Sequence, residues 1–599
     1  MTLVLVVAIP FATAIAVAIL GGRLGRRILG AITVAGLALS FGAGASMISA
    51  LRERPSLAAS IGSWLPLTGA DLALVVDSSM LAVALAITGV SALIALYSID
   101  YLAHDRHLQR YFAAFALLVG GMLLVVLASN LLLLVAGLQL AGVAAYLLVC
   151  HHPADDRAAA AAVRLLVIGR IGDAAILAGA LVLFTEFHTV DLAQLGGAAI
   201  ERGSTAGSAP VIASVLLLIG AIARSAQAPL HVWLPDSTEA TTPVSALLQT
   251  VAVTGGVILL MRLRSILVPD VLEAAAIVGG VTALGAAVVA IAQRDVRRIL
   301  AWSTISQVGL MFVAAGLGAL FAARFQLIAH ALLKAVLILG AGSVRRVTGD
   351  VWDIAGYGGL ASRMRWTAGA LGVGTVALAG LPPAAGFFGV AAIASAASSE
   401  SDVLLTALVL VAAGASAFAG VRLFALMFIA PRAGQREMEE PSRLQDIPLA
   451  ILAIGALGFG VIVNAGILPI GSGPADTAPL WLAIVTFGVA MAASVAAWLA
   501  YRHGIVAAAR IERTVGWARS GLGFDVLYAR GIARPFAGLA RELERGAERT
   551  LSDAIDGLGA LGTWSSRAIA HWPFDGRAQQ VMLLVSMVVL LAFWTWSGR

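Results

Sequence analysis

A membrane-spanning helix with a lysine near its centre is encoded by Phe325-Gln-Leu-Ile-Ala-His-Ala-Leu-Leu-Lys-Ala-Val-Leu-Ile-Leu-Gly340. Lys334 is the only lysine in 599 residues, because the other 38 of the 39 basic residues are arginine. A charged side chain at bilayer depth costs at least ~3 kcal/mol on insertion scales. A buried lysine can release its proton at reachable pH, whereas arginine stays charged. His330 lies one turn earlier on the same face, so this run predicts a buried site that titrates.

The composition outside this run predicts an all-α polytopic membrane protein. Hydrophobic residues make up 60% of the chain and charged residues 12%, against roughly 25% charged residues in soluble domains. In lipid the polar N–H and C=O groups of the backbone must hydrogen-bond to each other, which favours helices. Cys150 is the single cysteine, which excludes an intrachain disulfide and any cysteine-based iron–sulfur or zinc site. The basic pI of 9.9 comes from loop arginines and indicates membrane orientation rather than nucleic-acid binding.

Sixteen apolar runs are long enough to cross ~30 Å of hydrocarbon. They lie near residues 3–20, 30–50, 78–98, 111–128, 130–150, 163–185, 209–226, 243–262, 270–292, 298–318, 322–344, 367–395, 403–430, 447–468, 480–501 and 578–597. The first run is interpreted as a retained span because no cationic region or cleavage site accompanies it. Most loop arginines fall on one side of this arrangement, which the positive-inside rule assigns to the cytoplasm. Both termini are therefore predicted to face outward.

Two of the predicted spans are interrupted by proline. Ala226-Gln-Ala-Pro-Leu-His231 places a proline directly after one span, and Gly380-Leu-Pro-Pro-Ala-Ala-Gly386 places a pair inside another. Broken membrane helices free backbone groups and line polar paths near the bilayer midplane. Two breaks in separate halves of the chain suggest an internal repeat.

The segment 503–577 differs from the rest because it is polar with one apolar stripe. Its apolar residues recur every three or four positions from Ile532 to Leu561, a pattern typical of an amphipathic helix. Forty helical residues would extend ~60 Å, about twice a bilayer. We therefore expect a lateral helix along the membrane surface, fixed at its far end by the span 578–597. An ordinary interfacial amphipathic helix is the alternative.

Ionisable or polar residues inside the spans are the candidate functional groups, because such residues mark ion pathways by default. They are Gln139, Arg164, Arg170, Asp173, Arg224, Gln249, Gln326, His330 and Lys334. Arg164 and Arg170 are equally consistent with side chains that extend to the membrane surface. Asp173 lies three residues from Arg170, so a structural ion pair is an alternative to a relay role. Arg224 precedes the first break and could instead cap freed carbonyl groups.

Several motifs resemble one known family. They are Ser225-Ala-Gln-Ala-Pro-Leu-His-Val-Trp-Leu-Pro-Asp-Ser-Thr-Glu-Ala-Thr-Thr-Pro-Val-Ser-Ala-Leu247, Gln293-Arg-Asp-Val-Arg-Arg-Ile-Leu-Ala-Trp-Ser-Thr-Ile-Ser-Gln-Val-Gly309, His330-Ala-Leu-Leu-Lys-Ala-Val-Leu-Ile-Leu-Gly-Ala-Gly-Ser-Val344 and Ala379-Gly-Leu-Pro-Pro-Ala-Ala-Gly-Phe-Phe388. Together they resemble the antiporter-like membrane subunits of respiratory complex I, which are related to multisubunit cation/proton antiporters. The C-terminal Phe524-Asp-Val-Leu-Tyr528, the predicted long helix and the final span look like the subunit L or subunit 5 branch.

The resemblance implies two inverted five-helix repeats, each with a broken helix, in a protein of the bacterial inner membrane. The implied organisation is helices 1–3 in residues 1–110, a first repeat in 111–265, a second repeat in 266–432, helices 14–15 in 433–505, the lateral helix in 506–577 and the final anchor in 578–599. It also implies a row of protonatable residues along the bilayer midplane.

The chain departs from the family pattern at five relay positions. The resemblance places the expected glutamate at Gln139, a lysine at Arg224, two histidines at Gln249 and Gln326, and the last titratable residue at Val390. A neutral amide beside a permanently charged guanidinium cannot load and release protons. The missing carboxylate at position 139 should also leave the buried Arg224 without a partner. Asp173, His330 and Lys334 remain as candidate relay residues.

By resemblance the chain is a membrane-arm subunit of an NADH:quinone oxidoreductase-like complex, in which electron transfer in partner subunits drives proton translocation. Two alternatives stay open: a membrane subunit of a related complex (inorganic-carbon uptake, membrane-bound hydrogenase or cation/proton antiporter), and a non-conducting structural subunit. We expect no redox cofactor and no metal in this chain, with flavin and iron–sulfur clusters on partner subunits. The expected partners are other antiporter-like subunits and small membrane subunits, contacted partly by the lateral helix, together with the lipid bilayer.

Overall fold

The computed structural model describes residues 1–202, 207–349, 351–400, 402–431, 442–465, 479–505 and 509–524, with a few isolated positions between 530 and 542. Residues Met1–Phe524 form one compact unit, and Asp525–Arg599 belong to a second. The predicted anchor 578–597, and the part of the predicted lateral helix that carries the apolar stripe, lie outside the described residues apart from a few isolated positions.

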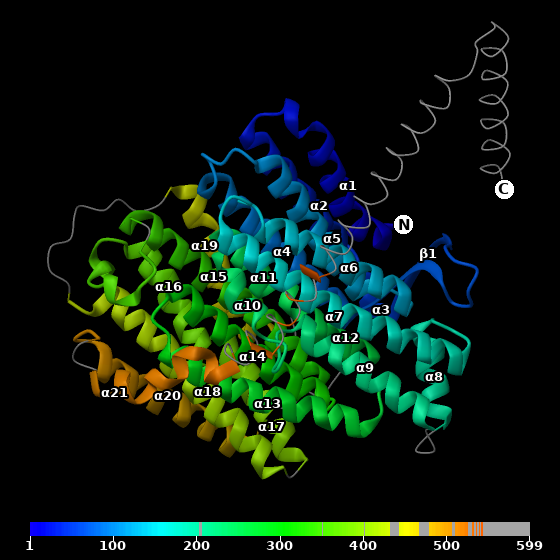
Figure 1. Ribbon diagram of the computed structural model, residues 1–599. Coiled ribbons are helices and arrows are strands. Elements are labelled where there is room, and N and C mark those ends of the chain that lie inside the picture. Colours follow the sequence, from blue (N-terminus) through cyan, green and yellow to red (C-terminus); the bar gives the residue numbers. More distant parts are fainter. Residues whose placement is uncertain are drawn as a thin grey trace, which may run out of the picture. The chain divides into compact units, whose positions relative to one another are not determined.

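The first unit is a bundle of helices (Figure 1). Its N-terminal part contains α1 Thr2–Leu20, α2 Arg26–Ala45, α3 Ile48–Glu53, α4 Ser78–Tyr101, α5 Leu108–Leu127, α6 Leu131–Val149, α7 Asp156–Phe187, α8 Leu192–Arg202, α9 Ser208–Arg224, α10 Trp233–Asp236, α11 Thr242–Thr250 and α12 Gly255–Leu263. The rest contains α13 Pro269–Ala292, α14 Val296–Gly316, α15 Leu320–Thr348, α16 Arg365–Leu378, α17 Ala385–Ser399, α18 Val403–Phe424, α19 Arg443–Asn464, α20 Leu480–Tyr501 and α21 Ala509–Val515.

Thirteen helices in the described residues are long and apolar enough to cross a membrane, and α9 and α17 are shorter apolar helices. Each predicted span before residue 502 coincides with a helical segment in its described part, but 243–262 divides into α11 and α12, and 367–395 divides into α16 and α17. The prediction succeeds because about 20 apolar residues are needed to cross the hydrocarbon, and their backbone amides can form hydrogen bonds there only within a helix.

The expectation of an all-α chain is wrong at one place. Strands β1 Ser56–Ser63 and β2 Asp71–Asp77 form an antiparallel hairpin, with Ser56 opposite Asp77 and a register shift between Ser60 and Gly62. The hairpin connects α3 to α4, and the last residue of β2 accepts a hydrogen bond from Met80 N, which caps α4. Asparagine and aspartate favour this N-cap position because their side-chain oxygen satisfies a free helix amide.

The centre of the bundle is formed by the helices that carry the lysine motif and its neighbours. Every residue in the apolar window of α14 is buried, and α15 and the α11–α12 pair are nearly as enclosed. α15 packs against α4, α11, α14, α16, α17 and α19, and Figure 1 shows α11, α14 and α15 in the interior of the bundle. Polar side chains on α15 are therefore shielded from lipid by protein.

Both predicted breaks are present. Between α9 and α10 the chain turns at Ala226, whose φ is 49°, and the indole of Trp233 donates to the carbonyl of Ala223 at 3.0 Å. Between α16 and α17 the turn lies at Gly380, with φ of 67°. Gly386 then approaches the chain so closely that a Cβ would stand 1.8 Å from the oxygen of Ala377. The Trp233 indole at the first break, and the backbone bonds from Gly380 and Leu381 at the second, thus satisfy carbonyl groups that the breaks free.

Residues 509–524, which we call the C-terminal strap, correct another prediction. The lateral helix was expected to begin at residue 506, but α21 ends at Val515 and a 3₁₀ turn follows over Gly516–Gly523. Gly521 and Leu522 adopt left-handed backbone angles, with φ of 65° and 57°. A continuous helix cannot pass through two such residues, so the described start of this segment is a kinked strap packed on α13.

Candidate functional site

Lys334 is completely buried and bonded only to neutral oxygen atoms among the described residues. Its Nζ donates to the carbonyl of Leu300 at 3.2 Å and to the hydroxyl of Ser303, both on α14. The Ser303 hydroxyl in turn donates to the same carbonyl at 2.9 Å. Neither acceptor carries a fixed negative charge, so no permanent counter-ion holds a proton on this amine.

Gln249 connects the lysine surroundings to His330. The hydroxyl of Thr304, next to Ser303, donates to Gln249 Oε1 at 2.9 Å. His330 Nε2 lies 3.1 Å from the backbone oxygen of Gln249, whereas His330 Nδ1 is buried without a hydrogen-bond partner in the described part of the chain. Polar atoms from α11, α14 and α15 therefore meet in one buried group, which we call the Lys334 cluster.

A second polar contact involves the N-terminal part of α15, near the helix α17 that follows the second break. Gln326 Nε2 donates to Gln307 Oε1 at 2.6 Å, and both side chains are buried. A Cβ on Gly389 would stand 2.0 Å from Gln326 Oε1, so only glycine leaves room for this amide. Val390 follows on α17 and is buried. This end of the polar row contains amides and an apolar side chain, none of which titrates.

A small cavity approaches the Lys334 cluster from the arginine-rich ends of the helices. Its volume is about 10 Å³, near the lower limit of ~10–15 Å³ for one water molecule. Its lining includes Thr242, Ser245, Gln249, Arg297, Leu300 and Trp352. Leu300 and Gln249, which belong to the Lys334 cluster, and Arg297, a charged residue, therefore line the same cavity.

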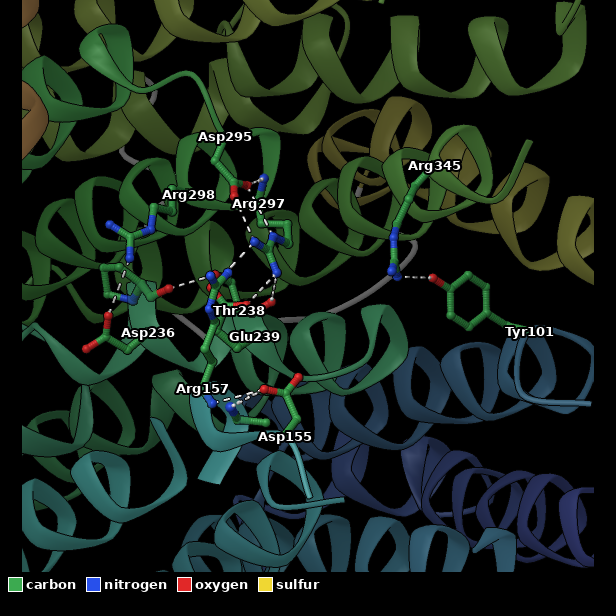
Figure 2. A network of polar contacts seen from close by, with 12 residues as sticks. Tyr101, Asp155, Arg157, Asp236, Thr238, Glu239, Asp295, Arg297, Arg298 and Arg345 are labelled. Carbon is green, nitrogen blue, oxygen red and sulfur yellow. Dashed lines mark hydrogen bonds and ion pairs between the residues drawn. The ribbon is translucent and has the colours of Figure 1, made fainter. Parts of the chain in front are cut away.

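The charged residues around Arg297 form the network in Figure 2. Arg297 donates to Glu239 Oε2 at 3.0 Å, to Asp295 Oδ2 at 2.8 Å and to the carbonyl of Thr238 at 3.2 Å. Its guanidinium also lies 5.0 Å from the ring centroid of Trp352, a cation–π distance. The arginine is therefore held in place by two carboxylates at the mouth of the cavity.

The first-half candidates form a separate group on α6, α7 and α9. Arg224 Nε donates to Asp173 Oδ1 at 2.7 Å, and its Nη2 donates to the carbonyl of Leu138 at 2.8 Å. Arg170 Nη2 lies 2.7 Å from Asp173 Oδ2, and Arg170 Nη1 donates to Gln139 Oε1. One buried carboxylate therefore lies between two guanidinium groups, and the Gln139 amide completes what we call the Asp173 cluster.

This geometry corrects the expectation that Arg224 lacks a partner. The carboxylate missing at position 139 is replaced by Asp173, one helix away on α7. Asp173 pairs with Arg224 as well as with Arg170, so the ion pair expected from the spacing on α7 is present. Arg164 lies inside α7 rather than at its end, and its Nη1 is 2.6 Å from Asp236 Oδ2.

A larger cavity of about 30 Å³ lies beside Arg224. Leu138, Leu165, Trp233 and Leu248 contribute to its lining, which is mostly apolar. The volume is enough for about two water molecules, but a buried water needs two to four polar partners. Arg224 is the main polar side chain on this wall.

Sequence reasoning missed the α14 side of the Lys334 cluster. Ser303, Thr304 and Gln307 face Lys334, Gln249 and Gln326, respectively. A signal was present, since four of the five residues from Ser303 to Gln307 are polar within an apolar span, and all four are buried. The network around Arg297 was also not anticipated, although the alternation of charges in Gln293-Arg-Asp-Val-Arg-Arg298 indicated it.

Comparisons with known proteins agree with this architecture. The sequence family described as NADH:quinone oxidoreductase/Mrp antiporter, transmembrane region, matches residues 128–416. The family described as NADH-ubiquinone oxidoreductase (complex I), chain 5 N-terminus, matches residues 64–112. NADH-quinone oxidoreductase subunit L of Mycobacterium tuberculosis strain H37Rv is 33% identical over 623 positions, which cover 98% of this chain and 97% of that protein.

Two solved structures share the fold. A chain of the Mrp complex from Dietzia sp. DQ12-45-1b superposes with a TM-score of 0.72 at 24% identity, covering 100% of this chain and 63% of that one. A chain of the membrane-bound sulfane sulfur reductase, an archaeal respiratory membrane complex, has a TM-score of 0.70 at 21% identity and coverages of 83% and 99%.

Proposed function

We propose, since the chain belongs to the NADH:quinone oxidoreductase/Mrp antiporter family of membrane subunits, that it is a membrane-arm subunit of an NADH:quinone oxidoreductase-like complex. In this role it couples electron transfer in partner subunits to proton translocation through its second half. The observation that carries the proposal is the bonding of Lys334: a fully buried amine whose described partners are two neutral oxygens. Such an amine can exchange a proton without breaking an ion pair.

Proton uptake takes place from the arginine-rich ends of the helices. A proton passes the Arg297 network and the small cavity, and the neutral amine of Lys334, which donates to the Leu300 carbonyl, accepts it. By the positive-inside rule these ends face the cytoplasm, so both termini face outward. His330 receives the proton next, since its unpartnered Nδ1 is available within the same cluster.

The first half does not conduct in this proposal. Asp173 is fixed between Arg170 and Arg224, and protonating it would leave two guanidinium groups without their shared counter-ion. Gln139 has no titratable proton, because its amide does not ionise. The Asp173 cluster is therefore a structural lock, and the proton yield per electron is lower than in a subunit with two active halves.

The rest of the chain assembles the complex. Residues 111–265 and 266–432 act as the two five-helix repeats, and the segment 506–577 contacts neighbouring antiporter-like and small membrane subunits. The chain itself binds no flavin or iron–sulfur cluster, and partner subunits supply these groups. The complex lies in the bacterial inner membrane, in keeping with the bacterial subunit L relative.

A second candidate function is a membrane subunit of a related assembly, such as a cation/proton antiporter. The observation that favours it is the Asp173 cluster, because a permanently paired first half suits a chain adapted from proton pumping to another use. The similarity of fold to the Mrp and sulfur reductase chains is equally compatible with this role.

Isolation of the intact assembly from native membranes separates these functions. Co-purification of subunits with flavin and iron–sulfur clusters, together with NADH-driven proton uptake in vesicles, supports the first function. A zinc-containing soluble partner would instead indicate inorganic-carbon uptake, and an assembly of membrane subunits alone would indicate an antiporter. If redox subunits co-purify and transfer electrons without proton movement, the chain is a non-conducting structural subunit.

A further inference from the structure

Two loops at one end of the bundle bring a carboxylate and two imidazoles together. Asp105 lies between α4 and α5, and His151 and His152 follow α6. The distance to Asp105 Oδ2 is 3.1 Å from His151 Nε2 and 2.9 Å from His152 Nε2. One possible ligand atom from each of the three residues lies within 4.8 Å of those from the other two, so the residues could bind one ion together.

We propose that Asp105, His151 and His152 form a binding site for a divalent transition-metal ion, with Zn²⁺ the ion best suited to this ligand set. Zinc is bound at ~2.0–2.1 Å by imidazole nitrogen and at ~2.0–2.2 Å by carboxylate oxygen, in tetrahedral geometry. Ligand atoms on a tetrahedron of that size are about 3.3 Å apart, so the two measured separations need to open by only a few tenths of an ångström.

The surrounding residues orient the carboxylate and leave it available. The amide of His107 donates to Asp105 Oδ1 at 2.8 Å, which directs the other oxygen toward the imidazoles. Arg110 donates to the carbonyls of Cys150 and His151 and forms no ion pair with Asp105. The positive charge of Arg110 opposes a bound cation, but Arg110 leaves the oxygens of Asp105 free for a metal ion. The bond from the His107 amide to the ligating carboxylate is typical of the outer shell of metal sites.

The protonation states also suit a metal. Burial lowers the pKa of His151 below its ordinary value, so the imidazole is neutral. Burial raises the pKa of Asp105, but hydrogen bonds from the His107 amide and the His151 ring outweigh burial and hold that pKa below its ordinary value, so the carboxyl is ionised. Metal ligands must be deprotonated in this way. Tyr111 packs edge-on against the His151 ring, at 5.5 Å between centroids, and limits its rotation.

One side of the site is open. The side chain of His152 is 50% exposed, whereas those of His151 and Asp105 are 1% and 7% exposed. A metal ion can therefore enter past His152, and the fourth coordination position faces solvent and takes water.

The prediction that the chain has no metal site rested on its single cysteine, and that argument does not apply to histidine and carboxylate ligands. A bound ion would join the α4–α5 loop to the turn after α6.

Metal binding to the purified full-length chain tests the site. The protein is stripped with EDTA and titrated with Zn²⁺ alone by calorimetry, and with Co²⁺ for its tetrahedral absorption. We expect one ion per chain, with affinity reduced at least tenfold in His152→Ala and in Asp105→Asn. His104→Ala is the matched control, because His104 is an exposed histidine one residue before Asp105 and lies outside the cluster.

Each outcome has a defined meaning. Loss of binding in both site variants but not in His104→Ala supports the site. Equal binding in all four proteins, or weakening by His104→Ala alone, overturns it. His152 is half exposed, so His152→Ala is expected to fold, and its unchanged melting temperature without metal verifies this. The same scan with Zn²⁺ should raise the melting temperature of the wild type and of His104→Ala only.

Discussion

Arg224 Nε lies 2.7 Å from Asp173 Oδ1, although 51 positions separate the two residues in the chain. Arg170, three residues from Asp173, approaches the other carboxylate oxygen at 2.7 Å. A single acidic residue thus compensates two arginines on neighbouring membrane helices. The charge that the first half needs is supplied by α7 rather than by α6, where the family pattern places it.

Replacing Asp173 with asparagine should destabilise the protein. The change keeps the side-chain shape but leaves Arg224 buried without an anionic partner, and breaking a buried pair costs roughly 3 kcal/mol or more. We expect a clearly lower melting temperature in detergent. Asp156→Asn on the same helix is the control, because Asp156 is exposed at the first turn of α7 and its loss should shift stability by less than ~0.5 kcal/mol. Equal melting temperatures for both variants would contradict the role assigned to Asp173.

Replacing Lys334 with methionine should abolish proton uptake through the second half. Lys334→Arg should do the same although it keeps the charge, because guanidinium does not release its proton. The measurement is the number of protons taken up per electron in the reconstituted complex. Leu332→Met, a change of similar volume on the same helix, should leave this number unchanged. Normal uptake by either lysine variant would remove Lys334 from the pathway.

Restoring a titratable pair in the first half should raise the proton yield. We expect Gln139→Glu combined with Arg224→Lys to increase the protons moved per electron, since both groups can then exchange protons. Gln139→Glu alone should have no effect, because the new carboxylate would pair with Arg170, which already contacts position 139. If the double variant also leaves the yield unchanged, other parts of this half no longer conduct, and the apolar cavity beside Arg224 is the first place to examine.

Replacing Glu512 with glutamine should release the C-terminal strap. Glu512 is buried and interacts with Arg422 at 2.9 Å, Arg519 at 2.7 Å and the hydroxyl of Tyr501 at 3.0 Å. Removing its charge leaves the fully buried Arg422 uncompensated, at a cost of about 3–5 kcal/mol. Limited proteolysis should cut near residue 510 faster in this variant. Arg513→Gln, at an exposed neighbouring position, should behave like the wild type; identical digestion of all three proteins would rule out the anchoring role.

The membrane-spanning helices and their two breaks could be predicted from the sequence because lipid imposes a simple rule on them. A run of about 20 apolar residues has one stable conformation in hydrocarbon, and proline interrupts it at a definite place. The hairpin over residues 56–77 was missed for the opposite reason. Its strands contain small residues such as Ala58, Ala59 and Ser60, and their alternation of burial is weak. Such segments have little β propensity of their own.

The site was predictable only where its residues share a helix. His330 and Lys334 are four positions apart, so their common face follows from helical spacing. Their hydrogen-bond partners come from α11 and α14, and the sequence does not specify how those helices are rotated against α15. The same limit explains the error about Arg224. Its partner is fixed by the packing of α7 against α9, and no local pattern indicates which carboxylate a packed helix will face.

The anchoring of the strap has a consequence for how the protein is made. Arg422 lies on α18, and the acidic residue that neutralises it comes 90 positions later in the chain. A ribosome that has completed α18 has not yet synthesised Glu512, so until the strap is made Arg422 keeps its bond to the carbonyl of Gln293 but lacks this carboxylate. Closure of this end of the bundle is therefore a late step of biogenesis. A chain truncated before residue 512 would be inserted without the carboxylate that pairs with Arg422.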